Sequence, residues 1–146
     1  MSTTADQGEV LYTAVVEVTG GRNGHATSVS GSLEVDLARP AERGTDAGTD
    51  PEELFAAGYA ACFDSSLAMA ARRARVKLGP ATVTAAVSLL KHTETRYGIS
   101  VKLTVRAPEC PQDVLTELVE AAHQACPYSN ALRSGAPVEI ETFGAA

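Results

Sequence analysis

Apolar and polar positions predict four β-strands. Residues 10–18 are rich in β-branched and aromatic side chains, and residues 26–37 alternate polar with apolar. The segment between them, residues 19–25, is dense in Gly and Asn, which favours a hairpin with Arg22 at or near its tip. Two further strands, residues 81–92 and 99–106, are joined by a short polar turn, so an antiparallel pair is expected.

Two segments carry helical patterns. Asp50 as N-cap, Pro51 at the first helical position and Glu53 at the third are start signals for a long helix. No strong helix breaker follows until Gly79-Pro80, which would allow about 40 Å of helix. Its first half is apolar nearly all round and rich in small residues, so we expect close neighbours on several sides.

The C-terminal third predicts one more helix and one more strand. Residues 111–125 have apolar positions at helical spacing, and Cys126-Pro127 should end that helix. Residues 138–143 would form a last short strand. With no internal repeat or linker, residues 9–146 are expected to form a single α+β domain, preceded by a disordered leader over residues 1–8.

Composition narrows the class of protein. The chain has 146 residues, 45% hydrophobic and 21% charged, with a net charge of −6, and no basic run that would track a phosphate backbone. Nucleic acid and a membrane are therefore not expected as partners. Residues 1–8 lack the basic start and apolar stretch of a secretory signal, which favours a cytoplasmic protein.

Three cysteines are too few, and odd in number, for a secreted disulfide framework. Cys62 falls inside the long apolar helix and Cys126 at the end of the second helix. Each could be a packing residue, because free cysteine is commonly buried. Each could equally be a reactive thiol. Cys110, just before a helix start, is interpreted as an incidental loop cysteine.

Arg22 and Glu52 are candidates to tune a thiol, because a thiolate needs a nearby cation and a buried arginine needs a carboxylate. Either could equally be a solvated surface charge. Glu52 and Cys62 are about 15 Å apart along one helix, too far for contact. If both serve one site, Arg22 bridges them, the helix bends, or Glu52 reaches the site from a second subunit.

Other chemistries have weaker support. His123 and Cys126 have helical i, i+3 spacing and could ligate a metal with Cys62, but no CxxC pair or HExxH motif accompanies them. Neither a serine elbow, nor a GxGxxG sequence, nor a P-loop is present.

Three motifs are shared with a known family. Residues 48–63 (GTDPEELFAAGYAACF), 123–131 (HQACPYSNA) and 20–24 (GGRNG) resemble the motifs of the organic hydroperoxide resistance proteins, a branch of the OsmC-like superfamily. The similarity runs from about residue 11 to residue 143. It implies an OsmC-like fold, with antiparallel sheets packed around a long central helix in an intertwined homodimer.

The resemblance also implies an activity. Cys62 would be the peroxidatic nucleophile and Cys126 the resolving cysteine of an intramolecular disulfide, with Arg22 and Glu52 as the activating pair. The substrate would be an organic hydroperoxide, the reductant a dithiol such as a lipoylated protein, and no metal, haem or flavin would be needed. Alternatives are an OsmC-like dimer that binds a hydrophobic ligand without turnover, and a redox sensor.

Substrate preference can be argued from the aromatic residues around the two cysteines. An apolar lining would favour bulky organic or fatty-acid hydroperoxides, although some of these side chains are expected to be plain core. The aromatic residues concerned are Phe55, Tyr59, Phe63 and Tyr128.

The chain departs from the family pattern at three positions. Asn23 stands where an acidic residue commonly follows the arginine, and Cys110 lies outside the pattern. Asp64 puts a carboxylate two residues after Cys62, and we expect it to face solvent or pair with a cation, because an unpaired carboxylate would raise the thiol pKa.

Overall fold

The computed structural model describes residues 8–40 and 48–144. The predicted leader lies outside this range except for Gly8, and so does most of the loop before the long helix. In chain order the elements are β1 (Val16–Thr19), the 3-10 helix η1 (Gly21–Asn23), β2 (His25–Ser28), β3 (Glu34–Asp36), α1 (Pro51–Ala74), β4 (Thr82–Lys91), β5 (Tyr97–Arg106), α2 (Gln112–Ala125) and α3 (Pro127–Ser134).

The long helix α1 begins where its local signals predict. The Asp50 carboxylate accepts a hydrogen bond of 2.8 Å from the Glu53 backbone N–H, with Pro51 at the first helical position. At 1.5 Å per residue its 24 residues span about 36 Å. The helix stops short of Gly79 because Arg75 adopts a left-handed conformation, φ 58°, after which Val76 and Leu78 turn back onto the core.

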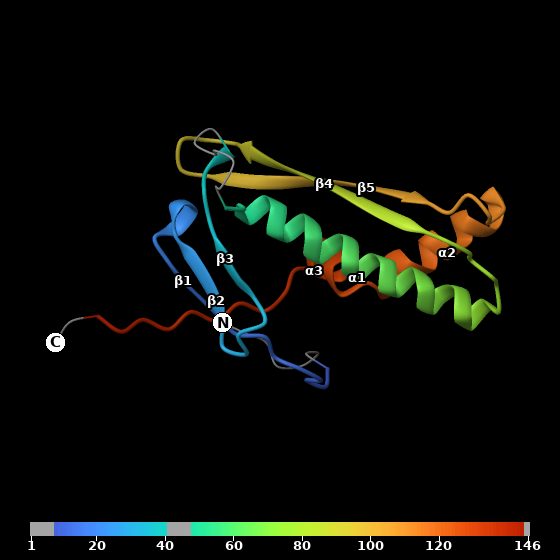
Figure 1. Ribbon diagram of the computed structural model, residues 1–146, viewed down its shortest axis with the longest axis horizontal. Helices are drawn as coiled ribbons and strands as arrows, with labels where there is room; N and C mark the ends of the chain where they lie inside the picture. Colours follow the sequence, from blue (N-terminus) through green and yellow to red (C-terminus); the bar gives the residue numbers. More distant parts are fainter. Residues whose placement is uncertain (1–7, 41–47, 145–146) are drawn as a thin grey trace.

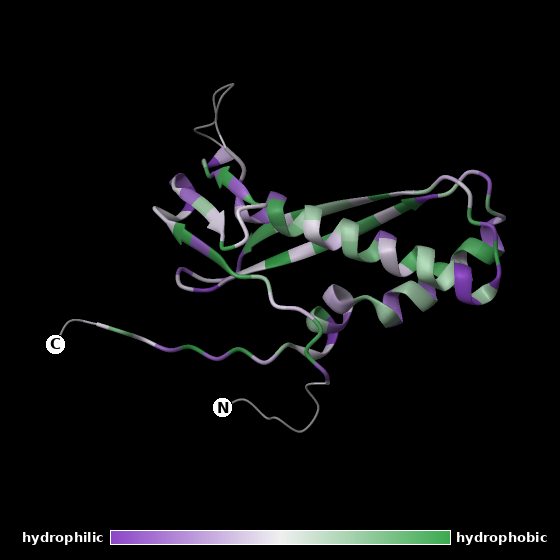
Figure 2. Cartoon of the chain, turned by 60° about the horizontal axis from the view of Figure 1, so that its bottom comes forward, coloured by the Kyte–Doolittle hydropathy of each residue, from purple (hydrophilic) through white to green (hydrophobic). Residues whose placement is uncertain are grey.

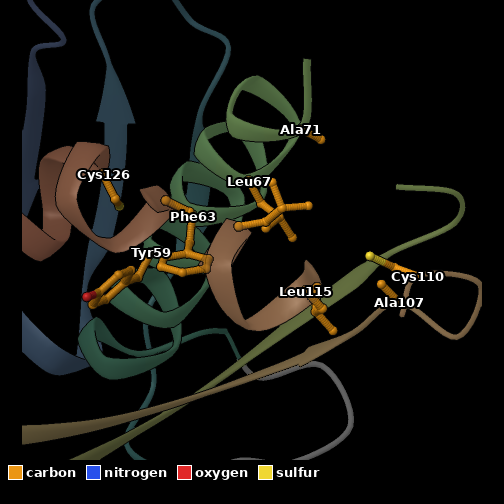
Figure 3. Packing of buried hydrophobic residues seen from close by; sticks show 10 residues of the cluster. Tyr59, Phe63, Leu67, Ala71, Ala107, Cys110, Leu115 and Cys126 are labelled. Carbon is orange, nitrogen blue, oxygen red and sulfur yellow. The ribbon is translucent and has the colours of Figure 1, made fainter. Parts of the chain in front are cut away.

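The core lies between α1, α2 and the β4–β5 hairpin (Figures 1 and 3). One stripe of α1 supplies buried side chains at i, i+4 spacing, and α2 supplies a facing set. Strand β5 adds partly buried aliphatic residues from the other side. The buried residues of α1 are Tyr59, Phe63, Leu67 and Ala71, and those of α2 are Leu115, Leu118 and Ala122.

Two antiparallel sheets are present in the described residues. Strands β4 and β5 pair along their whole length, from Thr82 opposite Arg106 to Lys91 opposite Tyr97, as the sequence predicts. Strands β1, β2 and β3 form a second sheet in that order, beside the N-terminal end of α1 (Figure 1).

The prediction of one strand over residues 26–37 is wrong. The chain pairs as β2, turns between Ser28 and Leu33, and returns as β3. Gly31 supplies a left-handed φ of 80°, and the Ser28 hydroxyl accepts a hydrogen bond of 3.0 Å from the Leu33 backbone N–H. Serines that satisfy the backbone locally favour a turn over a continuous strand.

Two further strand predictions fail in the single chain. Of the predicted residues 10–18 only 16–18 belong to a strand, β1, which continues to Thr19, and residues 138–143 form none. A strand needs a hydrogen-bonded neighbour along its length. Of residues 10–15, Val15 accepts a backbone hydrogen bond of 2.9 Å from Val29, but the pairing is not continued in the described residues. We call residues 8–15 the N-terminal arm and residues 135–144 the C-terminal arm; the latter runs away from the rest of the chain (Figures 1 and 2).

Cys126-Pro127 ends α2 as predicted, but a third helix that the pattern did not predict follows at once. Proline lacks the N–H needed to continue α2, yet it suits the first position of a new helix, so Pro127 separates α2 from α3.

The elements together give the predicted α+β class of fold. By length and composition α1 could also cross a membrane, but here it is a core helix with one stripe packed on α2 and β4–β5.

Candidate active site

Cys62 and Cys126 come together at the side of α1 that faces α3. Cys62 lies on α1, one turn after Tyr59, and is half-buried. Cys126 occupies the corner between α2 and α3, where it is 0% exposed, and Figure 3 shows it beside the Tyr59 end of the core. Neither forms a disulfide, and Cys62 packs against the core cluster that contains Cys126, close enough for Cys126 to affect its pKa.

The surroundings of Cys62 favour the neutral thiol. Burial raises the pKa of Cys62 most, and the neighbouring Cys126 raises it further. The backbone N–H of Tyr128, in the first turn of α3, opposes them by hydrogen bonding to the sulfur and lowers the pKa in part. Within the single chain, the balance leaves the Cys62 pKa above its ordinary value.

Arg22 and Glu52 form a two-pronged ion pair. Arg22 Nη1 donates to Glu52 Oε1 at 2.6 Å and Nη2 donates to Oε2 at 3.1 Å. Such a planar fork fixes the direction of the guanidinium as well as its charge. The hydrogen bond to Glu52 raises the pKa of Arg22 further, so the cation is permanent.

The β1–β2 hairpin presents Arg22 toward α1. Arg22 is in η1, at the tip of the hairpin as predicted, between Thr19 and its strand partner His25. Gly24 is required there, because a side chain at this position would overlap the Thr19 carbonyl oxygen. The Asn23 side chain, where the family commonly has an acid, accepts a hydrogen bond from the Arg39 backbone N–H at 3.3 Å.

The ion pair and the two thiols occupy different parts of α1. Glu52 is in the first turn, the helix is continuous to Ala74, and Cys62 is about 15 Å farther along its axis. Over the residues that the structure describes, no hydrogen bond or ion pair joins Arg22 to Cys62. The helix between Glu52 and Cys62 is therefore unbroken, and Arg22 is bound to Glu52 near its N-terminal end.

The four aromatic residues divide into two groups. Phe63 is 2% exposed and belongs to the core. Phe55, Tyr59 and Tyr128 contact one another with ring centroids 5.5 to 6.3 Å apart. Phe55 and Tyr128 also line an apolar pocket of about 320 Å³ with Pro127, Ala131 and Leu132.

The remaining candidates have local roles. His123 Nδ1 is hydrogen-bonded to the Ser129 hydroxyl at 2.9 Å, and no group of three or more metal-ligating side chains occurs in residues 8–40 and 48–144. Cys110 packs in the core at the end away from Cys126 (Figure 3). Asp64 is exposed, as predicted.

Two residues at the site escaped the sequence analysis. Ser129 is 1% exposed, and its hydroxyl is hydrogen-bonded to Tyr59 and His123. Gly58 lies against the hydroxyl end of the Tyr128 side chain. Both lie inside the motifs quoted above, but neither residue type by itself indicates a catalytic or binding role.

Comparison with known proteins places this arrangement in a family. The model of the OsmC-like protein family matches residues 44–141. Organic hydroperoxide resistance protein OhrA of Bacillus subtilis is 44% identical over 135 residues, covering 90% of this chain and 95% of the relative. OhrB of the same organism is 41% identical over 133 residues, covering 90% and 97%.

Solved structures agree. An organic hydroperoxide resistance protein from Legionella pneumophila superposes with a TM-score of 0.80 at 41% identity, covering 87% of this chain and 93% of that one. OhrB of Bacillus subtilis superposes with a TM-score of 0.77 at 39% identity, covering 90% and 98%.

Fold and site define an α+β protein with two neighbouring thiols, one on a long apolar helix and the other at the corner between two shorter helices. The chain belongs to the OsmC-like family, in its organic hydroperoxide resistance branch. Its class is that of a peroxidase-type redox enzyme involved in the response to oxidative stress.

Proposed function

We propose that this protein reduces organic hydroperoxides to alcohols with Cys62 as nucleophile and Cys126 as resolving cysteine. The Cys62 thiolate attacks the peroxide O–O bond, which releases the alcohol after protonation and leaves a sulfenic acid on Cys62. The Cys126 thiol then displaces water from that sulfenic acid, and a disulfide forms. The proximity of Cys62 and Cys126, two residues 64 positions apart in the sequence, is the observation that supports this proposal.

Burial supports the division of roles. Cys62 is half-buried, so a peroxide can reach its sulfur, whereas Cys126 is 0% exposed and meets only its neighbour. A nucleophile needs access and a resolving thiol needs proximity. We therefore assign the peroxide reaction to Cys62.

A homodimer would supply strand partners for the two arms and a packing surface for the open face of α1. Both arms expose apolar side chains of strand-like pattern, up to 86% at Leu11 and 91% at Phe143. Only 28% of the most apolar stretch of α1 is buried, which leaves a face of small residues open. Strand exchange through the arms and packing of α1 against a second copy would bury all of these surfaces.

Within such a dimer, we assign Arg22 and Glu52 to the thiol of the partner subunit. The pair is about 15 Å along α1 from Cys62 of its own chain, and the Cys62 pKa in the single chain is raised. A guanidinium held rigidly by Glu52 and brought to the sulfur would lower that pKa and orient the peroxide.

Mixed dimers test this assignment. Arg22→Ala and Cys62→Ser are each expected to be nearly inactive alone. After co-expression, a trans arrangement restores one complete site in each mixed dimer, and part of the activity returns. If the mixture stays as inactive as its components, the pair acts on its own chain.

Organic substrates are favoured by the apolar pocket formed by Phe55 and by the residues of α3 that follow Cys126. Its walls include Phe55, Tyr128 and Leu132, and its volume of about 320 Å³ suits an alkyl or aryl group. Tyr59 and Phe63 would support these walls from the core. Hydrogen peroxide would gain nothing from such a lining.

We propose that a dithiol, such as the dihydrolipoyl group of a lipoylated protein, reopens the disulfide, because a second thiol in the same molecule resolves the mixed disulfide efficiently. We also propose a cytoplasmic location, where the reducing environment would keep the three cysteines as thiols between turnovers. No metal, haem or flavin enters either step.

Peptide mass mapping tests the chemistry. The reduced protein is treated with one equivalent of an organic hydroperoxide, with hydrogen peroxide in parallel. We expect the organic peroxide to join Cys62 to Cys126 faster and to spare Cys110. Thiols that stay free, or that oxidise indiscriminately, would overturn the proposal and favour a binding role for the pocket.

A further inference from the structure

A buried chain of hydrogen bonds links all three helices at the site. The Ser129 hydroxyl lies 2.6 Å from the Tyr59 hydroxyl on α1 and 2.9 Å from His123 Nδ1 on α2. Ser129 is 1% exposed and Tyr59 is 4% exposed, so water cannot readily replace either partner. A buried polar group that loses its partner is costly, and this chain therefore specifies how α3 sits on α1.

A second contact sets the distance between the same two helices. The hydroxyl end of Tyr128 lies against Gly58 of α1, so closely that a β-carbon at position 58 would overlap the Tyr128 hydroxyl oxygen and lie 3.0 Å from Cζ. Because Tyr128 and Ser129 are adjacent, the ring contact and the hydrogen-bond chain hold the same turn of α3 from two sides.

The first turn of α3 positions the two groups that act on Cys62, the Tyr128 N–H and the Cys126 thiol. The Tyr128 backbone N–H faces the Cys62 sulfur, and Cys126 immediately precedes the turn. A small rotation of α3 would move both away from Cys62 together.

We propose that Ser129 is a positioning residue: through Tyr59 and His123 it holds the first turn of α3 so that the Tyr128 N–H and the Cys126 thiol both face Cys62. This inference rests on the proposed peroxidase function and goes beyond it, since it assigns the alignment of the two cysteines to a hydroxyl that takes no part in the chemistry.

The two steps of the reaction should respond separately to a loosened α3. The first step uses the thiolate, which the Tyr128 N–H stabilises. If α3 loosens and this N–H moves away, the Cys62 pKa rises and peroxide attack reaches its full rate only at higher pH. The second step closes an S–S bond of about 2.05 Å with a restricted dihedral angle, so it depends on where Cys126 is held. Slow closure leaves the sulfenic acid of Cys62 open to further oxidation by excess peroxide.

The test compares Ser129→Ala with Ser134→Ala, an exposed serine at the end of the same helix. Stopped-flow mixing with an organic hydroperoxide gives the rate of disulfide closure. The absorbance of the thiolate against pH gives the titration of Cys62 in a Cys110→Ser, Cys126→Ser background, where it is the remaining thiol. For Ser129→Ala we expect closure to slow by about tenfold, the Cys62 titration to move to higher pH, and sulfinic acid to accumulate on Cys62. Ser134→Ala should behave as wild type.

Tyr59→Phe provides an independent variant, because it removes one hydrogen bond and keeps the ring. It carries the same expectations if Ser129→Ala fails to fold, and its matched control is Tyr97→Phe on the exposed part of β5. Ser129→Thr, which retains the hydroxyl, should restore part of the closure rate.

The outcomes separate this inference from the proposed function. Wild-type closure and an unchanged thiolate titration in folded Ser129→Ala or Tyr59→Phe would overturn the positioning role and leave the peroxidase intact. Failure of the wild-type protein to form the Cys62–Cys126 disulfide would overturn the proposed function itself.

Discussion

The thiols of Cys62 and Cys126 lie close together although one belongs to the middle of α1 and the other to the corner between α2 and α3. Two separate motifs of the sequence thus meet at one point. Cys126 is fully buried and Cys62 is half-buried, so the two side chains differ in their access to solvent. This asymmetry is the basis of the first prediction.

Replacement of each cysteine should affect a different step. Cys62→Ser is expected to abolish consumption of an organic hydroperoxide, because the nucleophile is lost. Cys126→Ser should react once and then stall or over-oxidise, since no thiol resolves the sulfenic acid. Single-turnover oxidation followed by mass spectrometry distinguishes them, with Cys110→Ser as the control. Equal oxidation of wild type and Cys62→Ser would refute the assignment.

Replacement of Arg22 should change the pH dependence of peroxide attack. Removing the cation in Arg22→Ala is expected to raise the Cys62 pKa of the assembled enzyme and shift the rate profile to higher pH, by about tenfold in rate for each unit of pKa. Arg22→Lys keeps the charge but cannot reproduce the fork seen with Glu52, so it should recover only part of the rate. A profile identical to that of wild type would remove Arg22 from the site.

His25 should stabilise the β2–β3 pair mainly at acid pH. Its Nδ1 is 2.8 Å from the Asp36 carboxylate, and this hydrogen bond, with attraction to Asp36 and Glu34, raises the His25 pKa. A raised pKa in the folded state means that the stabilisation is fully present below about pH 6.5 and is lost as pH rises through the folded value.

Urea unfolding of wild type and His25→Gln across this range measures the effect. The difference in midpoint should be largest at acid pH and shrink with added salt, because the side chain is exposed. A difference independent of pH would contradict the role of the protonated ring.

The start of α1 should depend on a single cap. Asp50→Ala removes the acceptor of the Glu53 N–H and is expected to cost about 0.5–2 kcal/mol of unfolding free energy, whereas Asp50→Asn should cost less. Chemical unfolding provides the measurement. If the alanine variant is as stable as wild type, the cap does not control the helix.

Leu67 tests the packing between α1 and α2. It is 0% exposed, so Leu67→Ala should lower the unfolding free energy by about 2–5 kcal/mol, through lost burial and the cavity that remains. Met69→Ala on an exposed part of the same helix is the matched control. Equal losses for the two variants would argue against the core described here.

Local patterns in the sequence were sufficient for much of the fold. The start of α1 at Pro51, the hairpin with Arg22 at its tip, the β4–β5 pair and α2 were all predicted. In each case the signal is short-range: a capping carboxylate, glycines that permit a turn, or apolar residues at one period. Cys62 and Cys126 could be selected as candidates because they occur in recognisable motifs.

Only the tertiary structure decided the relationships between distant segments. Spacing along the chain carries no information on whether Cys62 meets Cys126, or on whether Arg22 pairs with Glu52 instead of contacting the thiol. The two arms have strand-like patterns but form no strand among the described residues, because a strand is completed by a partner along its length and not by its own residues. The position of Ser129 is of the same kind, since a serine becomes a structural link only when other helices bury it and surround it with partners.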